Sequence, residues 1–107
     1  MNIFPVSVES EMPGYVEAKY ILGHAYLKNG QPDKAKDAFL KVVNAPENEW
    51  TKSAKWHLVL ASLQSGDEQQ AIQFLDEIIE SNYDEYVDLA KRLKADLESP
   101  WRVLVFD

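Results

Sequence analysis

The sequence has no cysteine, and this absence excludes disulfide bonds, thiolate metal sites and cysteine nucleophiles. Basic residues are also few, because 11 lysines and arginines stand against 18 acids and leave a net charge of −7. This charge argues against nucleic acid and anionic membrane surfaces as partners. Residues 66–98 hold ten acids and three bases, whereas residues 1–65 hold seven of each and have a net charge of zero. The acidic half is interpreted either as a solubilising surface or as a face for a basic partner.

The chain also lacks an apolar run of membrane-spanning length and a basic-apolar leader at its start. We therefore expect no direct membrane insertion and a cytoplasmic location by default, or association with the cell envelope if the chain is part of a longer protein. With 107 residues, 46% of them apolar, the composition predicts one globular domain.

Apolar residues recur at spacings of three and four, the pattern of amphipathic helices. Five helices are expected, over residues 14–29, 32–46, 49–65, 67–82 and 83–98. Gly30 and Gly66 are expected to end the first and third of these in the left-handed conformation. Asn48 is expected to cap the third helix, and Asp67 with Gln70 forms a capping box. The first helix is expected to face inward with Ala18, Ile21, Leu22, Ala25 and Tyr26, and the last with Tyr86, Leu89, Ala90, Leu93 and Leu97.

The strongest signal is an internal repeat of 36 residues. At this shift seven pairs are identical: Ala18 and Ala54, Lys19 and Lys55, Leu22 and Leu58, Ala25 and Ala61, Leu27 and Leu63, Gly30 and Gly66, and Ala35 and Ala71. Each glycine makes a tight turn between two helices, and the small alanines allow close helix contact. Phe39 and Leu75 are expected to fill the gap between paired helices. Such a pair cannot hide its apolar face alone and stacks on copies of itself.

With these residues the chain resembles the tetratricopeptide repeat family. The first repeat matches through Leu22-Gly23, Tyr26, Gly30, Ala35, Phe39 and Val42, and the second through Leu58, Ala61, Gly66, Ala71, Leu75 and Ile78. The resemblance implies an all-α fold, a short α-solenoid of antiparallel helix pairs. More loosely, Trp56 to Ala61, Gly66-Asp67 and the helix from Tyr86 to Leu97 resemble repeat-containing tails of some bacterial envelope-associated proteins.

The expected organisation is a single repeat domain with apolar ends. It comprises an extended arm (1–13), a first repeat (15–46), a second repeat (49–82), a closing helix (83–98) and a tail (99–107). The arm carries Ile3, Phe4, Val6 and Val8, and the tail carries Trp101 to Phe106. A repeat stack leaves uncovered apolar surface at its two ends. We therefore expect the arm and the tail to pack on the chain itself, or else on a second copy.

The resemblance implies that the first helix of each pair lines a concave groove that binds a peptide or protein segment. The candidate groove residues are Tyr20, His24, Leu27, Lys28, Trp56, His57, Leu60 and Arg92. Aromatic residues and arginine commonly anchor interfaces. Tyr20 and Trp56 can instead pack against the arm or tail of the same chain. An alternative function is structural, since two repeats are fewer than the three usually needed and the domain can self-associate or complete a larger array.

No sequence motif points to an enzyme or a cofactor. His24 and His57 are too few for a zinc site, which needs a third and usually a fourth ligand. Ser53 lies four residues before His57, but no nucleophile-elbow glycines surround it. We therefore expect an interaction module without catalytic, cofactor or metal residues.

Overall fold

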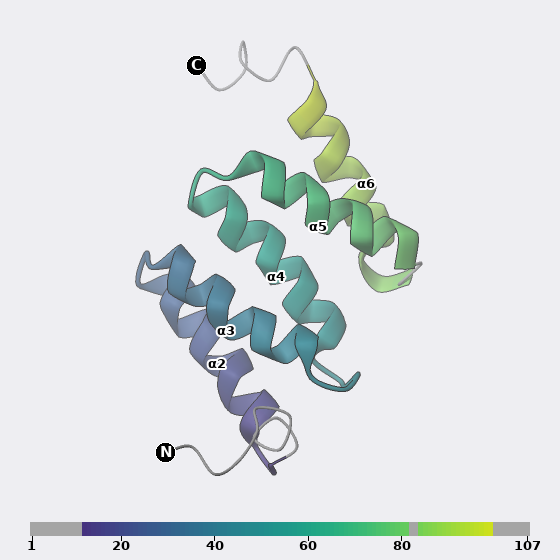
Figure 1. Cartoon of the computed structure of the whole chain (residues 1–107). Coiled ribbons are helices and arrows are strands. Elements are labelled where there is room, and N and C mark those ends of the chain that lie inside the picture. The colour runs from purple at the N-terminus through teal and green to yellow at the C-terminus, as the bar shows by residue number, and fades with distance from the viewer. Residues whose placement is uncertain (1–11, 82–83, 100–107) are drawn as a thin grey trace.

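The computed structural model describes residues 12–81 and 84–99, and these residues form five α-helices and no strand. The helices are α2 (Tyr15–Lys28), α3 (Pro32–Asn44), α4 (Thr51–Gln64), α5 (Glu68–Ser81) and α6 (Asp84–Glu98). The pair α2–α3, the pair α4–α5 and then α6 follow one another across the molecule, with α2 at one end of the row (Figure 1). The expected all-α, tetratricopeptide-like arrangement of about five helices is confirmed.

The two turns within the helix pairs have the same geometry. Gly30 and Gly66 adopt φ of 70° and 84°, in the left-handed region that favours glycine. After Gly30 the amide of Gln31 donates to the carbonyl of Tyr26 at 2.8 Å, and after Gly66 the amide of Asp67 donates to the carbonyl of Ser62 at 2.9 Å. These bonds close the helix ends as Schellman motifs. The expected role of both glycines is confirmed.

The helix starts agree in part with the expected caps. The carboxylate of Asp67 accepts the amide of Gln70 at 3.0 Å, which is one of the two bonds of a capping box. The second bond is not formed, because the Gln70 side chain accepts from Lys36 and Ser62 instead. Asn48 lies further from α4 than expected, because the residue before the helix is Trp50. The side-chain oxygen of Asn48 accepts the amide of Trp50, and the hydroxyl of Thr51 accepts the amide of Asn48, each at 2.9 Å. Asn48 therefore shapes the loop leading into α4.

Two clusters of buried side chains hold the helices together. The first joins α3 to α4 through Ala35, Phe39, Val42, Ala54, Leu58 and Ala61. The second joins α4, α5 and α6 through Val59, Ala71, Leu75, Ile78 and Ala90. The expected burial of Phe39 and Leu75, and of Ala35 and Ala71, is confirmed. Helix α4 is thus buried from both sides.

The expected inward face of α2 is wrong except at Tyr26, which packs against the first core cluster. Ala18 and Ala25 are exposed, Ile21 and Leu22 are 59% and 38% exposed, and Tyr26 is half-buried. The residues of α2 that meet the core are Val16, Tyr20, Gly23, Tyr26 and Leu27. The sequence pattern failed here because α2 is apolar on both sides, while α3 and α4 contact it on the side that carries Tyr20 and Leu27.

Leu89 is a second correction, because this expected core residue of α6 is 44% exposed. Its companion Ala90 is fully buried, and Lys94 pairs with Asp76 of α5 at 2.6 Å. The expected packing of the arm and of the tail concerns residues 1–11 and 100–107, which lie outside the described residues. In the part of the chain that is described, no helix has the length and apolarity needed to cross a membrane.

Candidate functional site

The candidate residues lie on α2, α4 and α6, the first helices of successive units. Side chains from these helices meet at two seams. The first seam, between α2 and α4, contains Tyr20, His24, Ser53 and His57. The second seam, between α4 and α6, contains Trp56 and Tyr86. The eight candidates therefore do not form one continuous cluster.

Aromatic rings fill the first seam. The rings of His24 and His57 are 4.2 Å apart between centroids, and Tyr20 lies 4.6 Å from His24 in an edge-on arrangement. Beneath them Phe39 of α3 stacks on His57 at 5.5 Å and meets His24 edge-on at 5.3 Å. Edge-to-face and offset contacts are the favoured geometries for such rings. The seam is therefore a packed aromatic joint between the two repeats.

Hydrogen bonds fix the polar atoms of this joint. The hydroxyl of Tyr20 bonds to Ser53 Oγ at 2.6 Å across the seam. His57 Nδ1 lies 2.8 Å from the carbonyl oxygen of Ser53, which can only accept, so Nδ1 carries the proton. This nitrogen has no lone pair to offer the Ser53 hydroxyl 3.3 Å away. His57 Nδ1 therefore cannot act as a general base toward Ser53 in this geometry.

The environment of His24 favours the neutral imidazole. Burial lowers the pKa of His24 below its ordinary value of 6.5, because a charged ring is poorly solvated in this seam. The positive charges of His57 and Lys28 lower the pKa of His24 further. Among residues 12–81 and 84–99, no group of three or more histidine, aspartate, glutamate or cysteine side chains is placed to hold a metal ion.

The second seam is more apolar. The rings of Trp56 and Tyr86 are 6.0 Å apart and nearly parallel, at 21°. Tyr86 was expected in the core and was not recognised as a partner of Trp56. The internal repeat contains a signal for the contact between Trp56 and Tyr86. At a shift of 36 residues, Tyr20 and Trp50 become Trp56 and Tyr86. The rings of Tyr20 and Trp50 are also in contact, 6.2 Å apart between centroids. By the same shift Leu89 replaces Ser53, the hydrogen-bonding partner of Tyr20.

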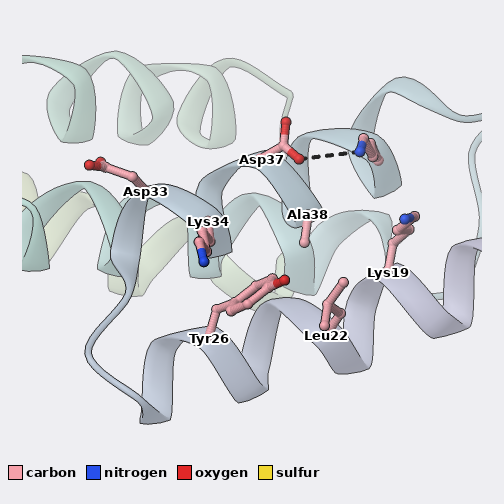
Figure 2. Close-up of a pocket in the computed structure, with 8 residues that line it drawn as sticks. Lys19, Leu22, Tyr26, Asp33, Lys34, Asp37 and Ala38 are labelled. Atoms are coloured by element: carbon pink, nitrogen blue, oxygen red, sulfur yellow. Dashed lines mark ion pairs between the residues drawn. The ribbon is translucent and has the colours of Figure 1, made fainter.

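The other candidates lie around the two seams. Leu27 packs partly on the first core cluster, and its carbonyl accepts a bond from Gln64 of α4 at 3.4 Å. Leu60 is half-buried on α4, whereas Lys28 and Arg92 are exposed. The pocket shown in Figure 2 lies elsewhere, between α2 and α3, and contains no candidate groove residue.

The stacked helix pairs and their identical glycine turns define an α-helical repeat protein. A family model of the tetratricopeptide repeat matches residues 16–49, which hold α2, α3 and most of the following loop. The match covers 34 of the 107 residues, and the five-helix arrangement of the described residues is consistent with tetratricopeptide-like repeats. No curated protein and no solved structure matches the chain. Tetratricopeptide repeats generally mediate protein–protein interactions and are typically non-catalytic.

Proposed function

We propose that the protein binds a peptide or protein segment through the face formed by α2, α4 and α6. The observation that carries this proposal is the second seam. Both rings of the Trp56–Tyr86 stack are half-buried, and Leu89, at 44% exposure, lies three residues after Tyr86 on the same side of α6. Half-buried aromatic rings beside an exposed aliphatic side chain are typical anchors of protein interfaces.

The rigidity of the first seam supports the same proposal. Tyr20, His24 and His57 pack α2 against α4, and the bond from Tyr20 to Ser53 satisfies the polar atoms there. A face held in this way is presented without large ordering losses when a partner binds. An extended or helical segment with a large apolar side chain fits it best, with that side chain placed against Trp56 and Leu89. The exposed cations Lys28 and Arg92 provide polar contacts around the two seams.

A peptide-display selection against the whole chain tests the proposal. Peptides selected on the wild-type protein are titrated against Leu89→Asp, which places a charge on the face without removing a buried side chain. We expect an affinity loss of about tenfold or more, since losing one apolar anchor and desolvating a carboxylate each weaken binding. The matched control is Ala95→Asp, which adds the same charge at another exposed position of α6.

Circular dichroism of both variants shows whether the helices are intact. Equal affinities of the wild type, Leu89→Asp and Ala95→Asp for every selected peptide would contradict this assignment of the face. Trp56→Ala provides a second test with a larger effect on packing, and its result is interpreted only together with its unfolding curve.

A further inference from the structure

A different surface, the outer side of α2, carries a second inference. This outer face consists of Ala18, Ile21, Leu22 and Ala25. Among the described residues, the exposed large apolar side chains are Met12, Ile21, Leu22 and Leu89, and three of these four lie on or directly before α2. Apolar side chains gathered in this way on a soluble protein mark a surface that is covered by something.

The equivalent faces of the later helices, α4 and α6, are buried. At a shift of 36 residues, Ala18, Leu22 and Ala25 become Ala54, Leu58 and Ala61, which are fully buried against α3. After a second shift Ala18 becomes Ala90, which is fully buried in the cluster with α5. In both cases the covering helix is the one that immediately precedes in the sequence. The outer face of α2 is therefore the one copy of this surface without a described neighbour.

The surroundings of Leu22 show what this surface lacks. Leu22 and Tyr26 of α2 point toward Ala38 of α3, and together they line an open hollow (Figure 2). In the second repeat the residue equivalent to Ala38 is Phe74, which packs against both core clusters. Additional apolar atoms can therefore fit against the first helix pair.

We propose that residues 1–11 of the same chain dock on the outer face of α2, in place of a preceding helix. This segment carries Phe4, Val6 and Val8 at alternate positions, and in an extended chain alternate residues share one side. It is also the segment that immediately precedes α2, as α3 precedes α4 and α5 precedes α6.

The turn before α2 is compatible with this docking. Gly14 has φ 80° and ψ −6°, the values of the third residue of a type II turn, and Pro13 occupies the favoured second position. The amide of Tyr15 donates to the carbonyl of Met12 at 3.1 Å and closes the turn. A closed turn reverses the chain direction, as docking of the preceding residues beside α2 requires.

The lengths agree with this arrangement. Helix α2 has 14 residues, about 21 Å at 1.5 Å per residue. Eleven extended residues span about 36 Å, more than enough to follow the helix. The four residues from Val8 to Met12 span about 13 Å when extended, and Tyr15 to Leu22 spans about 11 Å along the helix axis. Docking in this way would bring Val8 near Ile21 and Leu22.

Engineered cysteine pairs test the docking, because the natural chain has no cysteine to interfere. The test variant combines Val8→Cys with Ile21→Cys, and the matched control combines Val8→Cys with Leu89→Cys, at an exposed leucine of α6. Under mild oxidation at low protein concentration, we expect an intramolecular disulfide in the test variant at a rate at least about tenfold that of the control, since docking raises the local concentration of the two thiols. Equal rates of disulfide formation in the two variants would overturn the proposal. The proposal would also be overturned if the test variant formed only intermolecular disulfides, a result that would assign the face to a second copy of the chain.

Dye binding provides a second readout in the full chain. Val8→Asp removes an apolar contact of the docked segment and should increase the binding of a hydrophobic dye severalfold. Ser7→Asp adds the same charge at a position that alternation places away from α2, and should leave dye binding unchanged. Equal dye binding by the two variants would contradict the proposal. Both tests are independent of the seams, so their failure would leave the proposed binding function in place.

Discussion

Replacing Gly23 with alanine tests how closely the first two helices approach. Gly23 is buried in the middle of α2 and faces Phe39 of α3. A Cβ atom at this position would lie 2.6, 2.7 and 2.8 Å from three carbons of the Phe39 ring. Ordinary carbon–carbon contacts are about 3.5–4.0 Å, so the ring or the helix must move by about 1 Å.

Two opposing effects set the magnitude. Alanine favours a helix interior over glycine by about 1 kcal/mol, and this effect alone would stabilise the variant. Overpacking a well-filled core costs about 1–3 kcal/mol. The ring of Phe39 is fully buried among Tyr20, His24 and His57, so it has little room to move and the upper half of that range applies. We expect Gly23→Ala to destabilise the protein by about 1–2 kcal/mol.

Urea unfolding followed by circular dichroism measures this change, and a double-mutant cycle with Phe39→Leu assigns its cause. In the Phe39→Leu background the ring atoms that clash are absent, so Gly23→Ala should be neutral or stabilising. Ala95→Gly, at an exposed position of α6, calibrates the helix term and should cost about 1 kcal/mol. The close-approach argument fails if Gly23→Ala raises the urea midpoint, or if it destabilises both backgrounds equally.

Three further predictions concern the core, the turns and the seam. Phe39→Ala should destabilise the protein by about 3–5 kcal/mol and Leu75→Ala by about 2–5 kcal/mol, because each truncation leaves a cavity in a fully buried site; unchanged melting temperatures would contradict this. Gly30→Ala and Gly66→Ala should each cost roughly 1 kcal/mol in urea unfolding, from the left-handed backbone alone, since no atom lies within 4 Å of either added Cβ. Folding lowers the pKa of His24 below 6.5, so the unfolded chain takes up the proton first and the stabilisation is lost as the pH falls below 6.5. The urea midpoint should therefore drop between pH 7.5 and 5.5 by more in the wild type than in His24→Gln, and equal drops would refute the assignment.

The turns and the core could be predicted from sequence because they depend on contacts within a repeat. Gly30 and Gly66 follow helices of the same length and begin the same reversal. Phe39 and Leu75 stand nine residues after these glycines, where the second helix lies against the first. Short-range geometry sets both features, and each of them appears at equivalent residues in the two repeats.

The outer face of α2 could not be predicted in the same way. Its apolar spacing equals that of α4, so the pattern correctly identified a surface that is buried when a helix precedes it. Helix α2 is the first of the described helices, and none of them takes the place that α3 takes for α4. Periodicity indicates which surfaces are built for contact, but the position in the series decides which of them have a neighbour.

The two seams differ in a way that neither composition nor periodicity states, and this difference bears on the proposed binding. The repeat register places Tyr20 and Trp56 at equivalent positions, but their partners across the seams come from the next unit and are not equivalent. Tyr20 meets Ser53, and the resulting hydrogen bond satisfies both hydroxyl groups inside the protein. Trp56 instead has Leu89 at the corresponding position, which cannot form such a bond and is 44% exposed. Apolar surface gains free energy on leaving water, whereas a satisfied polar pair gains little. A partner that covers this face therefore gains most at the seam between α4 and α6, while the seam between α2 and α4 maintains the relative position of the two repeats.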